Sequence, residues 1–338
     1  MKINNNNKKT YLKIYSDVLP AAQTHRALAF YPPEKLKHFI GYVFLILLAL
    51  FILLTVSCNA AKGKEIIDRT GKQVTIKGDI KRVVSTAPSN TEIITDLGQA
   101  HKLVAVDVHS ANIKGIPANL PLLDFFYPDA EAIIALEPDL IIASGHNPTG
   151  TGEDPFRLLR EMGIAVVYIS MSKSIEDIYL DITFIADLLN AQKEGEELIR
   201  ASRKQIDEIA QRTANIINKK SVYFEISAAP YMMTFGKDSY INDMISVIGA
   251  RNIFENDNWL VSPGAESIIE RNPDVILTSV NYIDDPAGEI KSRPGFNHIT
   301  AVINNNVFQI DNDSSSRSSA RITLALRQMS EAVYPEFW

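Results

Sequence analysis

Residues 129–144 read DAEAIIALEPDLIIAS, and residues 264–279 read GAESIIERNPDVILTS. Aligned without gaps, the two stretches are identical at eight of sixteen positions, a proline and an aspartate among them. Their offset of 135 residues is too long for the repeat of a solenoid and matches the size of a domain. The chain therefore contains a duplication, and two related lobes are expected.

Each copy has the pattern of a helix followed by a strand. The first turn of the helix carries a glutamate, Glu131 or Glu266, and an Ile-Ile pair follows on the buried side. A Pro-Asp pair then ends the helix. The apolar run after it is typical of a strand that is buried on both faces. Each lobe is therefore predicted to be α/β with a mostly parallel sheet.

The sequence around the first copy continues this alternation. Strands are predicted at 82–86, 103–108 and 165–169, and helices at 91–97 and 156–162. Asn90 stands where it could cap the first of these helices.

Residues 174–219 differ from both lobes because they are poor in glycine and proline and have apolar residues at helical spacing. They predict two linking helices that break near 190–193, the second long and charged. An N-terminal lobe at 67–173 and a C-terminal lobe at 220–338 then flank this link, and an amphipathic helix is expected at 320–333.

The N-terminal part of the chain predicts a secretory signal. Residues 39–58 contain an uncharged apolar run after a basic flank, and they end in TVSC, which resembles a bacterial lipobox with Cys58 as the lipidated residue. An uncleaved membrane helix is the alternative. In either case the rest of the chain lies outside the cytoplasm, after an N-terminal extension at 1–38 and a tether at 59–66.

Composition narrows the class of function. Hydrophobic residues make up 46% of the chain and the net charge is -6, so the chain is globular and has no basic excess for nucleic acid. With one cysteine, no intramolecular disulfide can form. The motifs of serine hydrolases, P-loop proteins and zinc proteases are absent from the sequence, which leaves an enzyme acting on a metal chelate as a weak alternative.

Five further segments, together with the duplicated stretches, resemble the ABC-importer binding proteins of the iron-siderophore, haem and cobalamin group. They are DRTGKQVTI at 68–76, KRVVSTAPSNTEIITDLG at 81–98, LVAVD at 103–107, TFGKDSYINDMISVIGARNIF at 234–254, and RSSARITLALRQMSEAVYPEFW at 317–338. The resemblance implies two α/β lobes joined by a single long helix, with a metal chelate bound between them and no resident cofactor.

The resemblance also implies a partner. In this family one exposed glutamate on each lobe binds arginines of a permease, and these glutamates match Glu131 and Glu266. A permease with two-fold symmetry, served by its ATPase, would present the same basic site twice to a monomeric binding protein with two equivalent lobes. A sensor or adhesin that works without a permease is a further alternative.

Ligands of open α/β sheets bind beyond the carboxyl ends of the strands, so the loops there supply the candidate ligand-binding residues. These loops are rich in aromatic and amide groups and poor in charge, which favours a large, partly apolar ligand. The candidates are Pro88, Ser89, Asn90, Phe126, Tyr127, His146, Tyr231, Phe235, Trp259, Tyr282 and Arg317.

Three chelates fit this description to different degrees. A corrinoid ranks first because the cleft has little charge. A tris-catecholate ferric siderophore would favour several cations, and only Arg317 is evident. Haem would need an axial ligand such as His146 or Tyr127. Capture of bare zinc or manganese is the alternative that would need three or four histidine or carboxylate ligands.

Overall fold

The computed structural model describes residues 63–145 and 154–338. The predicted extension, the signal peptide with Cys58, residues 59–62 of the tether and the candidate His146 lie outside the described residues. Within the described part of the chain, no helix has both the length and the apolar character needed to cross a membrane. Residues 64–66, which the sequence assigned to the tether, belong instead to the first strand of the fold.

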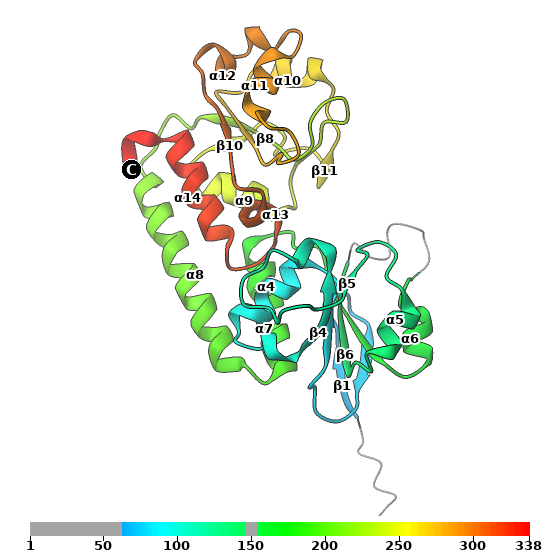
Figure 1. The fold of residues 1–338 in the computed structure, drawn as a ribbon. Helices are drawn as coiled ribbons and strands as arrows, with labels where there is room; N and C mark the ends of the chain where they lie inside the picture. Colours follow the sequence, from blue (N-terminus) through cyan, green and yellow to red (C-terminus); the bar gives the residue numbers. More distant parts are fainter. Residues whose placement is uncertain (1–62, 146–153) are drawn as a thin grey trace, which may run out of the picture. The chain divides into compact units, whose positions relative to one another are not determined.

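The N-terminal lobe is built on a five-stranded sheet in the order β5-β4-β3-β6-β7, and every neighbouring pair is parallel. The strands are β3 (Val83–Ser85), β4 (Leu103–Asp107), β5 (Leu122–Leu123), β6 (Leu140–Ser144) and β7 (Ala165–Ile169). Helices α4 (Pro88–Asp96), α5 (Ala130–Ala135) and α6 (Arg157–Glu161) connect them (Figure 1). Short 3-10 helices follow at Ala100–Lys102 and Val108–Ser110.

Both faces of this sheet are buried, as the apolar runs predicted. In β6, Leu140 and Ile142 pack into one hydrophobic cluster, while Ile141 and Ala143 pack into another on the opposite face. Alternate side chains of a strand point to opposite faces, so a strand covered on both sides needs apolar residues at every position.

An antiparallel hairpin of β1 (Lys64–Ile67) and β2 (Gln73–Ile76) precedes the sheet. Asp68 closes its turn, because its carboxylate accepts hydrogen bonds from the backbone N–H groups of Thr70 and Lys72. The same carboxylate accepts a hydrogen bond from the N–H of Tyr168 in β7. The conspicuous DRTG sequence therefore attaches the hairpin to the edge of the sheet.

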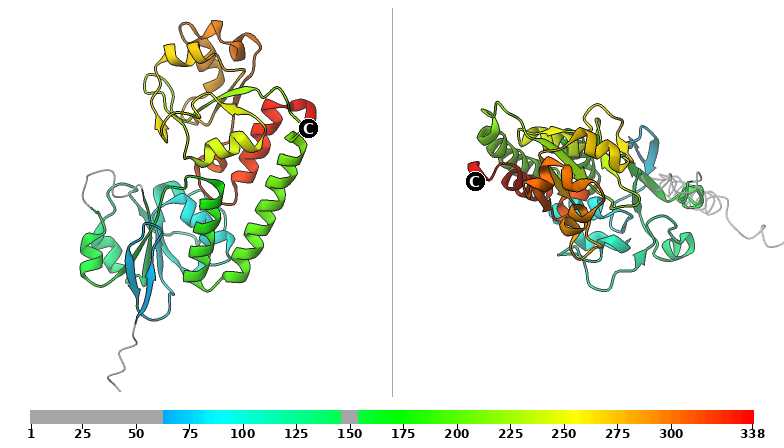
Figure 2. Two further views of the ribbon diagram at one scale, coloured as in Figure 1. Left: turned by 180° about the vertical axis from the view of Figure 1, so that it is seen from behind. Right: turned by 90° about the horizontal axis from the view of Figure 1, so that it is seen from above.

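Two helices, α7 (Ile175–Leu189) and α8 (Gln192–Thr213), occupy the predicted link. Asn190, in the left-handed conformation, ends α7 at the expected break. Helix α8 has 22 residues and reaches from the N-terminal to the C-terminal lobe along one side, where α14 (Ile322–Val333) packs beside it (Figures 1 and 2).

The C-terminal lobe repeats the architecture with a four-stranded parallel sheet in the order β10-β8-β12-β13. Its strands are β8 (Ser221–Glu225), β10 (Arg251–Asn252), β12 (Val275–Thr278) and β13 (Val307–Gln309), and β9 (Thr234–Phe235) pairs separately with β11 (Leu260–Val261). Its other helices are α9 (Tyr240–Val247), α10 (Ala265–Arg271), α11 (Pro286–Ser292), α12 (Thr300–Ile303) and α13 (Asn312–Ser316), with 3-10 turns at Phe296–His298 and Pro335–Phe337.

The duplication is visible in the strand order. The order β4-β3-β6-β7 of one lobe corresponds to β10-β8-β12-β13 of the other, and the repeated stretches supply β6 and β12 at the same position of two separate sheets. The aspartates of the two Pro-Asp pairs also have the same structural role in both lobes. Asp139 accepts hydrogen bonds from the N–H groups of Lys81 and Arg82 just before β3, and Asp274 accepts one from the N–H of Ser221 at the start of β8.

The structure corrects one detail of the first helix. Asn90 does not cap it, because α4 already begins at Pro88 and the Asn90 side chain donates to the carbonyl of Ile142. Proline is favoured in the first turn of a helix, where its missing N–H is not needed.

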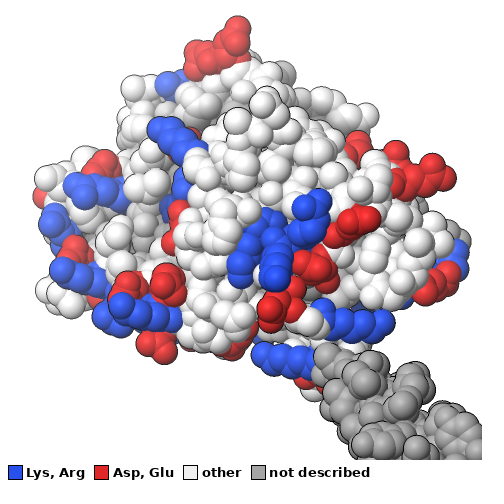
Figure 3. Space-filling view, turned by 60° about the horizontal axis from the view of Figure 1, so that its bottom comes forward, with Lys and Arg blue, Asp and Glu red and all other residues white. Residues whose placement is uncertain are grey.

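Charged side chains of both signs are interspersed over the face of the described residues that Figure 3 draws.

Candidate ligand-binding cleft

A cavity of about 400 Å³ lies between the two lobes. In the N-terminal lobe it is lined by segments at the carboxyl ends of the strands, such as Ala87 to Asn90 after β3 and Ser170 to Ser172 after β7. In the C-terminal lobe, Ile226 follows β8 and Ser279 follows β12. The carboxyl ends of both sheets therefore face one shared space, which is where open α/β sheets bind ligands.

The strand order explains why the cavity lies there. From β3 the chain proceeds outward through β4 to β5 and then returns to place β6 on the other side of β3. Loops that leave β3 and β6 therefore diverge and open a crevice between them. The C-terminal lobe has the equivalent reversal between β8 and β12.

Aromatic side chains from both lobes form the apolar part of the wall. Phe125 and Phe126 pack edge to face with their ring centroids 4.9 Å apart in the N-terminal lobe. Phe235 and Trp259 line the cavity from the C-terminal lobe, and these two rings contact each other with their centroids 5.5 Å apart. The antiparallel pair of β9 and β11 places these two together, since Phe235 ends β9 and Trp259 precedes β11.

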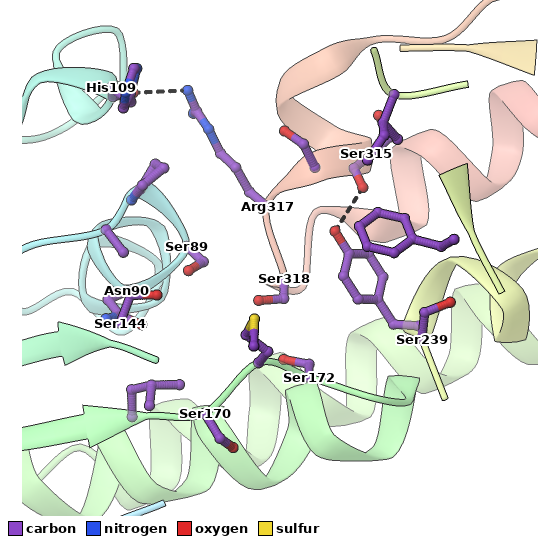
Figure 4. A pocket seen from close by; sticks show the side chains of 18 of the residues that line it. Ser89, Asn90, His109, Ser144, Ser170, Ser172, Ser239, Ser315, Arg317 and Ser318 are labelled. Carbon is purple, nitrogen blue, oxygen red and sulfur yellow. Dashed lines mark hydrogen bonds between the residues drawn. The ribbon is translucent and has the colours of Figure 1, made fainter. Parts of the chain in front are cut away.

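Hydroxyl groups form most of the polar wall, and Figure 4 shows them gathered around the cavity. The lining serines come from both lobes and are Ser89, Ser144, Ser170, Ser172, Ser239, Ser279, Ser315, Ser316 and Ser318. Tyr240 also lines the cavity, and its hydroxyl donates to the carbonyl of Ser315 at 2.9 Å. Burial raises the pKa of the Tyr240 phenol, so it is a neutral donor at physiological pH.

His109 lines the cavity on a turn that Asp107 holds in place. The Asp107 carboxylate accepts hydrogen bonds from the N–H of His109, at 2.9 Å, and from the hydroxyl of Ser110. The His109 ring contacts Phe125 edge to face. Burial raises the pKa of the Asp107 carboxyl, and the hydrogen bonds it accepts partly oppose that shift.

Arg317 is the one residue among the described lining residues with a permanent positive charge, and it is not free. Its guanidinium lies 2.8 Å from the Glu92 carboxylate of α4 and 2.8 Å from that of Asp313. It also donates to the carbonyl of His109 and to the side-chain oxygen of Asn112. Figure 4 shows the side chain reaching from the C-terminal lobe to the His109 turn of the N-terminal lobe.

The structure brings seven of the eleven candidate ligand-binding residues into the cavity wall. These are Pro88, Ser89, Asn90, Phe126, Phe235, Trp259 and Arg317. Arg317 lines the cavity as predicted, but its side chain is only 8% exposed and is paired with two carboxylates.

Three candidate tyrosines lie outside the cavity wall. Tyr127, Tyr231 and Tyr282 are exposed to 64%, 79% and 66%, respectively. The Tyr282 hydroxyl accepts a hydrogen bond from the N–H of Ala228, so this side chain supports the loop after β8. These residues follow strands as expected, but their side chains are largely exposed and do not line the cavity.

The sequence did not identify several lining residues, notably His109 and the segment Ser170 to Ser172, and of the Phe125-Phe126 pair only Phe126 was chosen as a candidate. All of them follow the carboxyl end of β4, β5 or β7, so the same strand-end rule applied to every strand would have found them. The partner of Arg317, Glu92, carried no signal of its own because it is 225 positions away in the chain.

A family model described as "Periplasmic binding protein" matches residues 83–314. An uncharacterised ABC transporter substrate-binding lipoprotein of Bacillus subtilis (strain 168), YvrC, is 30% identical over 271 residues, which cover 80% of this chain and 85% of the relative.

The chain belongs to the periplasmic binding protein family.

Further similarities agree with this membership. A vitamin B12-binding protein of Vibrio parahaemolyticus is 26% identical over 75% of this chain and 89% of the relative. The crystal structure of a possible iron-binding (periplasmic solute-binding) protein from Staphylococcus epidermidis has a TM-score of 0.68 and 31% identity, covering 76% of this chain and all of that one. The expected fold and family are thus confirmed, and the family is one of solute-binding proteins, not enzymes.

In this periplasmic binding protein, Glu131 and Glu266 occupy equivalent places. Each lies in the first turn of its helix, α5 or α10, and each is exposed. Both helices lead back to the repeated strand, β6 or β12, so both first turns lie toward the carboxyl edge of a sheet. A negative charge is also favourable near a helix N-terminus. This effect explains why a glutamate is stable at each position, but it does not explain why both lobes carry one at the equivalent position.

Proposed function

We propose that this protein binds a metal chelate between its two lobes and delivers it to the permease of an ABC importer. The observation that carries the proposal is the cavity itself, to which both lobes contribute corresponding strand ends. A volume of about 400 Å³ lies in the range of small-molecule sites, which is roughly 300 to 1,000 Å³. Relatives named for vitamin B12 and for Fe(3+)-citrate support a chelate as the class of ligand.

The chemistry of the wall favours a chelate over a bare metal ion. Bare zinc or manganese requires several imidazole or carboxylate ligands directed at one point. Among the described lining residues His109 is the one imidazole, no carboxylate occurs, and hydroxyl and aromatic groups predominate. Such groups bind the organic periphery of a chelate. Corrinoid, ferric siderophore and haem are the three classes to compare.

We propose further that Cys58 anchors the protein to the outer side of the cell membrane as a lipoprotein. The lipobox-like TVSC and the name of the lipoprotein relative support this assignment. A tethered binding protein would stay close to its permease, and two acyl chains suffice for stable anchoring.

Tryptophan fluorescence tests ligand binding, because the chain has two tryptophans and only Trp259 lines the cavity. Full-length protein in detergent is titrated with cyanocobalamin, ferrichrome and haemin. We expect saturable quenching by at least one of them, with a dissociation constant of about 1 μM or tighter.

The two tryptophans provide matched variants for this titration. Trp259→Phe should lose most of the quenching. Trp338→Phe should keep it, because Trp338 stacks on Arg212 at the C-terminus and does not line the cavity. Failure of all three chelates to bind, by fluorescence and by equilibrium dialysis, would refute the proposed function.

A further inference from the structure

We infer that Glu92 selects chelates without net negative charge, by neutralising the one permanent cation in the described wall of the cleft. This inference rests on the proposed function and names the class of substrate within it. It concerns the contact between α4 of the N-terminal lobe and the Arg317 segment after α13 in the C-terminal lobe.

The Glu92 carboxylate is committed to this contact. Its side chain is 2% exposed, one oxygen lies 2.8 Å from the Arg317 guanidinium, and the other accepts a hydrogen bond of 2.7 Å from the hydroxyl of Ser319. Its partners all belong to the other lobe, at the edge of the cleft.

Arg317 and the two carboxylates that contact it, Glu92 and Asp313, carry a net negative charge. One guanidinium lies between two carboxylates, because Asp313 contacts the same Arg317 and also accepts a hydrogen bond from Asn112. Arg317 and Glu92 are both buried, so water screens their fields less than it would at the surface. An anionic ligand in the cavity therefore meets a cation that is already compensated.

The rest of the wall suits an uncharged ligand. Hydroxyl groups can donate to or accept from amide, hydroxamate and hydroxyl groups, and the rings of the lining Phe and Trp residues cover apolar surface. Recognition of several catecholate or carboxylate oxygens would instead call for unpaired arginine or lysine side chains.

A second ion pair between the lobes provides an internal control. Arg321 and Asp96 pair at 3.0 Å, each four residues beyond the first pair, on the same two segments. Neither residue lines the cavity. Arg321 also interacts electrostatically with Glu92 and Asp313, but Asp96 does not contact Arg317 directly. Loss of this pair would weaken the contact between the lobes and change the charge beside Arg317 less than loss of Glu92 or Asp313 would.

The test compares the binding of two ferric chelates that differ in net charge to full-length protein in detergent. Ferrichrome is an uncharged ferric trihydroxamate, and ferric enterobactin is a triply negative tris-catecholate. The wild-type protein should bind ferrichrome more tightly. Glu92→Gln and Asp313→Asn should each shift the affinity ratio toward ferric enterobactin by about tenfold, and the double variant should shift it further.

Asp96→Asn should shift this ratio much less than Glu92→Gln, because Asp96 does not contact Arg317. Asp313 is 40% exposed, so its substitution tests the charge effect even if loss of buried Glu92 impairs folding, which thermal denaturation would reveal. The inference is overturned if the wild-type protein prefers the anionic chelate, or if the ratio moves equally in Asp96→Asn and Glu92→Gln. Failure of both chelates and of cyanocobalamin to bind would instead count against the proposed function.

Discussion

Asp181 is a buried carboxylate that connects three parts of the N-terminal lobe. From α7 it accepts a hydrogen bond of 2.6 Å from Arg69 in the hairpin turn and one of 3.1 Å from Ser172 in the cleft wall. Burial raises the pKa of the Asp181 carboxyl from 3.8 to about 6, because the loss of hydration outweighs the attraction of Arg69. The residue therefore holds a proton over a range in which an unfolded chain would release it.

This shift predicts a pH dependence of stability. Between about pH 4 and 6 the folded state binds more protons at Asp181 than the unfolded state, so the free energy of unfolding falls as pH rises through that window. The full contribution is up to about 3 kcal/mol, and above pH 6 the effect levels off. Asp181→Asn should remove this part of the slope in urea unfolding curves recorded at a series of pH values.

Asp177→Asn is the control for this measurement, since Asp177 lies 3.7 Å from the same Arg69 but is 31% exposed. It should retain most of the slope, because Asp181 is still present and burial is the main cause of its raised pKa. If Asp181→Asn and the wild-type protein show the same slope between pH 4 and 6, the assignment to Asp181 is wrong.

At the scale of elements, the junction of α7 and α8 depends on a close approach. Gly195 is buried in the first turn of α8, where a Cβ atom would lie 2.8 Å from the Cβ of Ala186 in α7. Two effects oppose each other if this glycine is replaced. Alanine favours a helix by about 1 kcal/mol, whereas overpacking a tight contact costs roughly 1 to 3 kcal/mol.

We expect the steric effect to win, because the contact involves two Cβ atoms that are fixed to helix backbones. Gly195→Ala should therefore lower the free energy of unfolding by about 1 to 2 kcal/mol in urea denaturation. Adding Ala186→Gly should restore room and recover part of the stability. An increase in stability for Gly195→Ala alone would show that the helices can separate at little cost.

The elements themselves were largely predictable, for physical reasons that differ from case to case. The Pro-Asp pairs mark the helix ends before β6 and β12, and continuous apolar runs mark strands buried on both faces. The start of α4 was misplaced because Asn90 is a good capping residue, although Pro88 in the first turn was the stronger signal. The two-residue strands β9 and β11 were missed because so short a pair has no periodicity.

For the whole molecule, the duplication predicts the cleft but not the contacts that cross it. The same strand order in both lobes directs equivalent loops toward one space, so strand-end residues such as Ser89 and Phe126 could be chosen from the sequence. The pairs Glu92–Arg317 and Asp96–Arg321 join the lobes over 225 positions. No local pattern reports such a pairing, because it depends on how the two lobes pack.

The same duplication gives the two exposed glutamates their proposed role. Glu131 and Glu266 stand at equivalent places toward the carboxyl edges of the two sheets, the edges that face the cleft. A permease that receives the ligand must approach the opening of the cleft. Two carboxylates related by the duplication would match two basic sites related by the symmetry of the permease.

Charge reversal separates docking from ligand binding. The double variant Glu131→Lys and Glu266→Lys should reduce cellular chelate uptake to background, and each single change should reduce it several-fold, because two like charges would then meet in each contact. Chelate affinity of the purified protein should stay within about twofold, since neither residue lines the cavity. Glu137→Lys with Glu270→Lys is the matched control, because both residues are exposed and lie just after the C-terminus of α5 and near the C-terminus of α10, where a positive charge is tolerated. Uptake that persists in the first double variant, or that falls equally in the control, would place the permease contact elsewhere on the protein.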